Sequence, residues 1–319
     1  MDIKLIKEKI EQYDTIIIHR HVSPDGDAIG STLGLREILR CAYPDKEIYS
    51  AGDSIPEYLQ FVGKEDEICD DKYENALLIV VDTSDKKRIA GKNIEKCKEI
   101  IKIDHHIPTD DYGTINYVKE DYGACALLIC ELANEIGYQI TKEAARYLYV
   151  AIITDTGRFR YAEVDGYALK MAGELIDKGI DTQSIFANLY SKNKEVYTLT
   201  SYLYRNIKYT PSGVAYFYMS KRAMKKYKVN IEDASNCVNL MDSIKGTLIW
   251  VLFIEKDDKI RIRLRSRFVS IVKIANEFDG GGHENAAGAT IYHKKEMKKV
   301  LKALDELHFE YKSNHGDKF

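Results

Sequence analysis

His21-Val22-Ser23-Pro24-Asp25-Gly26-Asp27-Ala28-Ile29-Gly30 joins two segments of different periodicity. The apolar residues 15–18 before it predict a buried strand, and residues 31–40 after it have apolar side chains at helical spacing. This decapeptide therefore predicts a turn from a parallel strand into a helix, at the edge where open α/β sheets bind ligands. One His and two Asp on so short a turn favour a shared divalent cation. The alternative is an Asx-rich helix cap, in which Pro24 and Gly26 only shape the backbone.

Length and charge limit the class of protein. A chain of 319 residues with 45% hydrophobic residues predicts two domains, each with its own core. The 47 Lys and Arg against 50 Asp and Glu give a net charge of -3. This balance argues against a protein that coats long duplex DNA, but it allows a short nucleic-acid ligand in a local basic pocket.

The cysteines and the N-terminus indicate a cytoplasmic protein without a membrane partner. The six cysteines include no CxxC pair, and several lie in apolar segments, so we expect buried free thiols. The first residues are charged and amphipathic, without the apolar region of a signal peptide. No apolar run approaches the roughly 20 residues needed to span a bilayer.

The N-terminal half predicts a parallel sheet with helices on both faces. The predicted strands are residues 15–19, 47–51, 76–81 and 99–103, and the predicted helices are residues 3–12, 31–40, 124–136, 142–153 and 167–178. Three of the strands end in acidic or imidazole residues. Because successive βα units bring their strand ends to one edge, these distant residues should converge.

The second half predicts a smaller mixed sheet with helices. The polar stretch 188–200 predicts a linker between a domain of residues 1–187 and one of residues 201–319. We expect hairpins from residues 204–209 with 214–219 and 248–255 with 260–267, helices at 269–278 and 294–307, and a strand at 290–293.

Seven ligand-type residues lie at the predicted strand and helix ends: His21, Asp25, Asp27, Asp82, His105, His106 and Asp155. A core histidine held by hydrogen bonds is the usual alternative for any one of them. Carboxylate and imidazole donors without thiolate favour Mn²⁺, with Mg²⁺, Co²⁺ or Fe²⁺ as competitors. So many ligands suit two ions about 3.5–4 Å apart, an arrangement that activates hydroxide for attack on a phosphoester.

The motifs HVSPDGDAIGS, VDTSD, DHH and TDTG, in this order, resemble the four signature motifs of the DHH phosphoesterase superfamily. RLRSR followed by GGGHENAAGA resembles the DHHA1 substrate domain. The whole pattern is most similar to the bacterial bifunctional oligoribonuclease/pAp phosphatase (nanoRNase) group. This resemblance implies an active site in the cleft between the two domains, and a homodimer would be typical of the family.

The resemblance also implies roles for individual residues. One ion would be held by His21, Asp25, Asp82 and Asp155, and the other by Asp27, Asp82, His105 and Asp155. His106 would face the scissile phosphate, and Asp104 would orient the histidines. We expect His19 to support the site from behind or to be structural. Cys125 stands where relatives often have small hydroxyl residues, so a substrate contact there is open.

Substrate contacts are expected in the second domain. Arg261, Arg263, Arg265 and Arg267 alternate along one predicted strand and so share a face. A solvated face is the alternative, which we favour for Arg261; Arg265 and Arg267 are the expected phosphate contacts, and the resemblance supports Arg265 and Ser266. Gly281, Gly282 and His283 predict either a flexible turn or a backbone nest for a phosphate or nucleotide. Tyr122 or Tyr161 could stack a base.

We therefore expect a Mn²⁺-dependent phosphoesterase that hydrolyses short oligoribonucleotides (nanoRNA) to mononucleotides and 3′-phosphoadenosine 5′-phosphate (pAp) to AMP. One alternative is a stand-alone phosphodiesterase for cyclic di-AMP or pApA. The other, from a different class, is a non-catalytic nucleotide-binding regulatory protein that has kept the fold.

Overall fold

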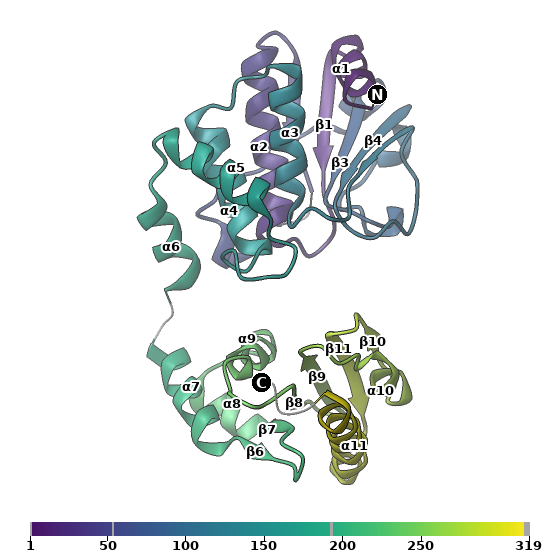
Figure 1. The fold of residues 1–319 in the computed structure, drawn as a ribbon. Coiled ribbons are helices and arrows are strands. Elements are labelled where there is room, and N and C mark those ends of the chain that lie inside the picture. Colours follow the sequence, from purple (N-terminus) through teal and green to yellow (C-terminus); the bar gives the residue numbers. More distant parts are fainter. Residues whose placement is uncertain (1, 53, 192–193, 316–319) are drawn as a thin grey trace. The chain divides into compact units, whose positions relative to one another are not determined.

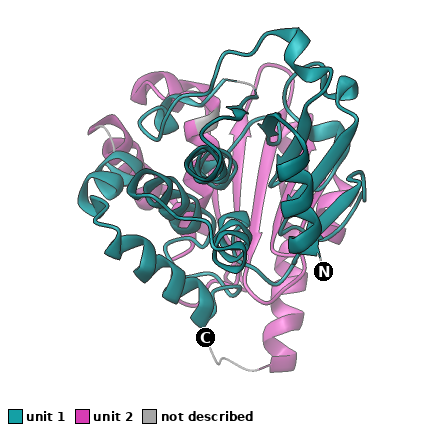
Figure 2. Ribbon diagram, turned by 90° about the horizontal axis from the view of Figure 1, so that it is seen from above, with its two compact units in different colours: residues 1–191 teal, residues 192–319 magenta. Residues whose placement is uncertain are grey.

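The computed structural model describes residues 2–52, 54–191 and 194–315. The chain divides into two compact units, Met1–Ser191 and Lys192–Phe319, which Figure 2 colours separately. Each unit has its own sheet and its own hydrophobic core. None of the described helices combines the length and the apolar character needed to cross a bilayer.

The first unit contains a five-stranded parallel sheet in the order β2-β1-β3-β4-β5 (Figure 1). Its strands are β1 (Thr15–His19), β2 (Glu47–Ser50), β3 (Leu77–Val81), β4 (Glu99–Asp104) and β5 (Ile115–Val118). The first four confirm the sequence prediction to within one residue at each end. The edge strand β5 was not predicted, because four residues with mostly half-buried side chains give no detectable period.

The α-helices of this unit contribute to one large core cluster with the sheet. They are α1 (Asp2–Gln12), α2 (Gly26–Ala42), α3 (Cys125–Ile136), α4 (Lys142–Asp155), α5 (Gly166–Asp177) and α6 (Thr182–Tyr190). The opposite face of the sheet, with Ile17, Leu78 and Val80, packs on a separate cluster. That cover comes from loops and from the 3-10 helices Asp70–Tyr73 and Ile94–Lys96, so the prediction of helices on both faces is corrected: the described α-helices of this unit pack in the cluster on one face. Another two 3-10 helices, Glu57–Leu59 and Lys86–Arg88, lie in the connections.

Helices α2 and α4 pack closely because glycines of α2 face α4. A Cβ atom at Gly30 would lie 2.8 Å from the Cβ of Ala151, and one at Gly34 would lie 2.7 Å from Leu148. At Gly26 the added atom would collide with Thr154. The missing side chains let the start of α2 lie against the end of α4, so that these two segments can bring their carboxylates together.

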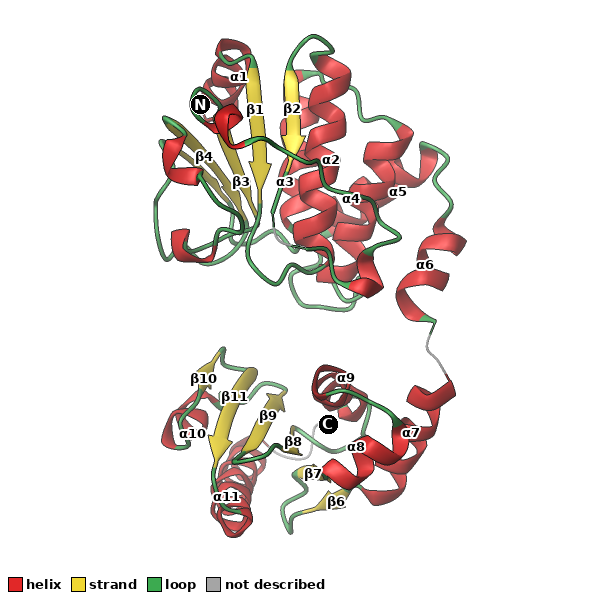
Figure 3. Cartoon of the chain, turned by 180° about the vertical axis from the view of Figure 1, so that it is seen from behind, coloured by secondary structure: helices red, strands yellow, loops and turns green. Residues whose placement is uncertain are grey.

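The second unit contains a six-stranded mixed sheet in the order β10-β11-β9-β8-β7-β6 (Figure 3). The strands are β6 (Lys208–Tyr209), β7 (Ala215–Met219), β8 (Ile249–Glu255), β9 (Ile260–Ser266), β10 (Gly281–Gly282) and β11 (Ala286–Ile291). Only β7 and β8 pair in parallel among these described strands. The helices are α7 (Lys194–Asn206), α8 (Lys221–Tyr227), α9 (Ile231–Asn236), α10 (Val272–Glu277) and α11 (Met297–His315). A 3-10 helix, Cys237–Met241, follows α9, and another, Lys294–Glu296, precedes α11.

The predicted strand 204–209 is wrong over its first half. Residues up to Asn206 belong to α7, because Leu199 and Leu203 are buried one helical turn apart and anchor that helix in the core. The hairpin survives only as the short pair β6–β7. Much of the stretch 188–200 is likewise helical, since α6 extends to Tyr190 and α7 begins at Lys194.

Other predicted boundaries in this unit differ from the observed ones, whereas the second predicted hairpin is confirmed. Strands β8 and β9 pair antiparallel as predicted, and β11 begins at Ala286, four residues before the predicted start. Helices α8 and α9 were not predicted, because helices of seven and six residues have too few turns for a periodic signal.

Four of the six free cysteines are buried, and Cys41 and Cys69 are exposed.

Candidate metal centre

The structure brings the seven ligand-type residues together at the carboxyl edge of the parallel sheet. They lie after the ends of β1, β3 and β4, at the start of α2 and in the last turn of α4. Their ligand atoms form three overlapping groups, within each of which all atoms lie within 4.8 Å: Asp82 with His105 and His106, His21 with Asp25 and Asp82, and Asp27 with His105 and Asp155.

Asp82 stands at the centre of this cluster. Its Oδ2 lies 3.5 Å from His21 Nε2, and its Oδ1 lies 3.4 Å from His105 Nε2. The residue is only 2% exposed, and Oδ1 has no hydrogen-bond partner among the described residues. Its φ of 52° is in the left-handed region that Asp adopts at some energetic cost. A buried carboxylate oxygen without a hydrogen-bond partner, aimed at imidazole nitrogens, fits a role of Asp82 as a cation ligand.

Two histidines present the same ring nitrogen to the carboxylates. His105 Nδ1 lies 2.8 Å from the carbonyl oxygen of Tyr122, and His21 Nδ1 lies 2.9 Å from that of Val22. A carbonyl only accepts hydrogen bonds, so each Nδ1 carries a proton. Nε2 is then the nitrogen that a metal can bind once it has lost its proton, and for His105 it lies 3.2 Å from Asp155 Oδ2 and 3.7 Å from Asp27 Oδ2.

Asp27 is held by three hydrogen bonds from two helices. Ser31 Oγ donates to its Oδ1 at 2.8 Å, one turn along α2. At the start of α3 the backbone N–H groups of Cys125 and Ala126 donate to Oδ2 and Oδ1, at 2.6 and 3.2 Å. The helix N-terminus thereby stabilises the negative charge of the carboxylate. Cys125 contributes its backbone only, because its side chain is completely buried and its thiol lies 3.3 Å from the carbonyl oxygen of Ile103.

Both interpretations of Asp25 apply, one to each of its oxygens. Oδ1 caps α2 by accepting hydrogen bonds from the N–H groups of Asp27 and Ala28, both at 3.1 Å. Oδ2 lies 3.8 Å from His21 Nε2. The capping bonds therefore orient the second oxygen for a ligand role.

Crowding of the carboxylates shifts their pKa values in opposite directions. Burial and the charge of Asp82 raise the pKa of Asp27 to about 7, and burial and the charge of Asp27 raise that of Asp155 to about 8. Burial also opposes ionisation of Asp82, but the close imidazoles of His105 and His21 hold its pKa well below the ordinary value. Burial lowers the pKa of His105, yet Asp82 and Asp27 raise it to about 10. The cluster thus takes up protons where cations would otherwise sit, and its oxygen and nitrogen donors fit a divalent metal.

His106 points differently from His105. Its Nδ1 donates to Asp104 Oδ1 at 2.8 Å and lies 3.5 Å from Asp82 Oδ1, and its side chain is 43% exposed. The hydrogen bond to Asp104 raises the pKa of His106. Asp104 was expected to orient both histidines, but it contacts only His106, because the carbonyl of Tyr122 holds His105.

Lys102 was not anticipated from the sequence. It is completely buried beneath the DHH motif, with its ammonium 3.4 Å from Asp104 Oδ2. The same group donates to the carbonyl oxygens of Ser84 and Asp110, at 3.2 and 3.0 Å. A lysine within a predicted buried strand was the available signal, because a buried ammonium needs a partner.

His19 and two tyrosines lie outside the ligand groups. His19 is buried on the opposite face of the sheet, where its ring nitrogens contact the carbonyl of Ala90 and the hydroxyl of Tyr73. These contacts fit the structural alternative better than support of the ligand groups. Tyr122 is half-buried against Tyr167, and Tyr161 is exposed.

The predicted substrate residues of the second unit lie at the end of β9 and around β10. Ser266 Oγ donates to the carbonyl of Val269 and accepts from Asn285 Nδ2, so it holds the loop after β9. Arg267 follows the strand, with its guanidinium 5.4 Å from the ring centre of Trp250. This loop exposes Phe268 at a φ of 64°.

The glycine segment differs from the predicted phosphate nest. Gly281 and Gly282 form β10 and pair with Gly288 and Ala287 of β11. A Cβ atom at Gly282 would lie 2.8 Å from the Cα of Ala287, so close strand pairing explains that glycine. The next residue, His283, is exposed.

Comparison with known proteins agrees with this architecture. Residues 15–152 match the DHH family, N-terminal domain, and residues 212–308 match the DHHA1 domain. The bifunctional oligoribonuclease and PAP phosphatase NrnA of Bacillus subtilis is 38% identical over 93% of this chain and 96% of its own length. The protein of the same name from Mycoplasma genitalium is 33% identical over 92% and 93%. The crystal structure of an exopolyphosphatase-related protein from Bacteroides fragilis has a TM-score of 0.86 at 29% identity, covering 98% of this chain and 96% of that one.

The parallel-sheet unit, the mixed-sheet unit and the carboxylate–imidazole cluster define a two-domain phosphoesterase with candidate groups for divalent metals. The chain belongs to the DHH/DHHA1 phosphoesterase family. The sequence prediction of family, fold class and enzyme class is therefore confirmed.

Proposed function

We propose that the protein hydrolyses short oligoribonucleotides to mononucleotides and pAp to AMP, with two Mn²⁺ ions. The ligand groups that meet at the buried, unpartnered carboxylate of Asp82 carry this proposal. The relatives named oligoribonuclease and PAP phosphatase, which align over nearly the whole chain, support the substrate class.

The ligand sets are those expected from the sequence. His21, Asp25, Asp82 and Asp155 would hold one ion, and Asp27, Asp82, His105 and Asp155 the other. The close approach of His105 Nε2 to Asp27, Asp82 and Asp155 supports the second set. When bound, such a pair supplies a nucleophile from water and neutralises charge on the phosphoryl oxygens.

His106 is the proposed proton and hydrogen-bond donor to the substrate. Because Asp104 accepts from Nδ1, the other ring nitrogen remains for the phosphate. The raised pKa of His106 favours the imidazolium, which can donate a hydrogen bond to a phosphoryl oxygen or a proton to the departing oxygen. The buried ammonium of Lys102 lies 3.4 Å from Asp104 Oδ2 and helps to hold this side chain in place.

The second unit would hold the phosphates and the nucleoside of the substrate. Arg265 and Arg267 offer guanidinium groups that match phosphate oxygens, and exposed His283 lies nearby in sequence on the β10–β11 turn. The substrate site between the two domains stays a prediction, as do a cytoplasmic location and a homodimer.

The test is a substrate panel with Mn²⁺ and with a chelator. Wild-type protein is expected to hydrolyse pAp and RNA of two to five nucleotides with a higher kcat/KM than pApA or cyclic di-AMP. A preference for cyclic di-AMP or pApA would replace this proposal with the phosphodiesterase alternative. Nucleotide binding without any metal-dependent hydrolysis would support the regulatory alternative.

A further inference from the structure

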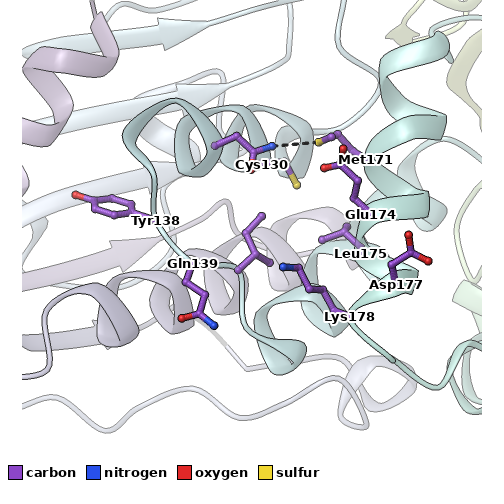
Figure 4. Close-up of a pocket in the computed structure, with 10 residues that line it drawn as sticks. Cys130, Tyr138, Gln139, Met171, Glu174, Leu175, Asp177 and Lys178 are labelled. Carbon is purple, nitrogen blue, oxygen red and sulfur yellow. Dashed lines mark hydrogen bonds between the residues drawn. The ribbon is translucent and has the colours of Figure 1, made fainter.

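Two cavities outside the metal centre differ in the charge of their walls. One of about 380 Å³ is lined by residues of α3, of α5 and of the segments that follow them, among them Met171, Glu174, Asp177 and Lys178 (Figure 4). Its mixed charges select no ligand. The other, of about 300 Å³, lies on the sheet of the second unit and is lined by Lys256, Lys259, Arg261, Arg263, Asp279, Gly288, Ala289 and Thr290. Four cations against one carboxylate favour an anion there.

Three arginines of β9 form a row that leads into this second cavity. Arg261, Arg263 and Arg265 alternate with the buried Ile262 and Leu264, so all three project from one face of the sheet. Alternate residues of a strand are about 6.6 Å apart, and the row therefore spans about 13 Å. Successive phosphates of an extended single strand of nucleic acid are separated by about the same 6.6 Å as neighbouring arginines of the row.

The strand on one side of this row leaves space over the arginines. Arg261 stands opposite Thr290, Arg263 opposite Gly288 and Arg265 opposite Ala286. A Cβ atom at Gly288 would already approach Arg263 Nη1 to 3.8 Å. Because the β11 residues opposite the arginines are small, they leave the guanidinium groups accessible to a ligand.

The charges of Arg261 and Arg263 are not paired within the described part of the chain. Arg261 and Arg263 form neither a side-chain hydrogen bond nor an ion pair with any residue that the structure describes. On the β8 side the neighbours of Arg261 and Arg263 are Ile254 and Leu252. Burial and the charges of Arg261 and Arg265 lower the pKa of Arg263, which shows that its surroundings already hold excess positive charge.

We propose that Arg263 and Arg261 bind successive phosphates of an oligoribonucleotide beyond the phosphate at Arg265. The sequence favoured a merely solvated Arg261; the cavity instead makes it part of the binding surface. This inference rests on the proposed function and deepens it, because pAp is too short to occupy the whole row whereas a pentanucleotide can. The row therefore distinguishes substrates by chain length.

The experiment compares the double variant Arg261→Gln, Arg263→Gln with the charge-matched control Lys298→Gln, Lys299→Gln. The control residues are exposed on α11, whose buried residues pack in the cluster on the opposite face of the sheet. The ratio of kcat/KM for pentaadenylate over pAp is expected to fall about tenfold in the arginine variant and to stay at the wild-type value in the control. Binding of fluorescent pentaadenylate is measured by anisotropy in EDTA at several salt concentrations. The slope of the logarithm of the binding constant against the logarithm of the salt concentration should become shallower by about 1.4 in the arginine variant, or about 0.7 for each lost phosphate contact.

The outcomes separate the two proposals. A wild-type enzyme that hydrolyses both substrates, with an unchanged ratio and salt slope in the arginine variant, overturns the phosphate row and leaves the function intact. An equal loss in the lysine control also overturns the row, since overall charge would then explain the effect. A wild-type protein without hydrolysis overturns the proposed function, while the anisotropy slope still decides on the row.

Discussion

The metal centre and the arginine row use charge in opposite ways. The candidate metal centre gathers acids and imidazoles from four segments around the buried Asp27 and Asp82, and hydrogen bonds hold Asp25, Asp27, His21 and His105 in place. The arginines come from a single strand, are half-exposed, and Arg261 and Arg263 lack side-chain partners among the described residues. A tightly constrained cluster should fail completely when one bridging ligand is lost, whereas an open row should lose affinity by degrees.

The largest effect is expected from Asp82→Ala. Removal of the central carboxylate should lower kcat/KM for pAp at least about a thousandfold, beyond the loss of a single transition-state hydrogen bond. The metal-free variant should keep its fold but melt lower than wild type, because His21 and His105 lose the carboxylate with which they pair. Circular dichroism and thermal melts with and without Mn²⁺ check this.

The matched control for that variant is Asp121→Ala, an exposed carboxylate outside the ligand groups. It should retain wild-type activity. Metal-dependent hydrolysis that persists in Asp82→Ala would show that this cluster does not hold the catalytic metals.

A smaller effect is expected from Asp104→Asn, which keeps the shape of the side chain but removes its charge. His106 should lose its orientation and its raised pKa, and kcat should fall about 10- to 100-fold with little change in KM. The Mn²⁺-induced rise in Tm should persist, because Asp104 lies outside the three ligand groups. Loss of that rise would instead make Asp104 a support of the ions.

The metal centre should also bind Mn²⁺ more weakly in acid. Asp27 and Asp155, with pKa values of about 7 and about 8, hold protons at pH 6 that a cation must displace. Affinity should therefore rise about tenfold from pH 6 to pH 7 and continue to rise to pH 8.

Thermal melts test the direction of this pH dependence in a second way. The carboxyl pKa values lie above the ordinary 3.8, so the folded metal-free protein binds protons that the unfolded chain has released, and its stability falls as the pH rises from about 4 toward 7 and 8 and levels off above these values. The stabilisation from His105 is likewise lost as the pH rises toward 10. The Mn²⁺-induced gain in Tm should grow over the same range, and a gain that shrinks with pH would contradict the pKa values.

The smallest effect is expected from Arg265→Gln on the open strand. One half-exposed phosphate contact is worth up to about 1 kcal/mol, so KM for pAp should rise about fivefold with kcat nearly unchanged. Steady-state kinetics at low and high salt check this. The difference in KM between the variant and wild type should become smaller at high salt, because salt screens the wild-type contact. A fall in kcat as large as that of Asp104→Asn would end the contrast between the two regions.

Local sequence patterns identified most of the elements that carry the candidate site. Strands β1, β3 and β4 are runs of apolar residues, and each leads directly into ligand-type residues, so both the sheet edge and the residues at it could be predicted. The short elements β5, α8 and α9 could not, because four to seven residues contain too little periodic pattern. The glycines of β10 looked like a phosphate loop until their pairing with β11 explained them.

The sequence by itself determined the family, the two-sheet architecture and which side chains gather at the strand ends, because residue type, spacing and the handedness of βα connections are readable along the chain. Only the tertiary structure decided what supports each of them. The N–H of Cys125 reaches Asp27 across 98 residues, the carbonyl of Tyr122 orients His105, and buried Lys102 stands behind Asp104. Such partners are chosen by packing in three dimensions, where a backbone group serves as well as a side chain and leaves no signature in the sequence.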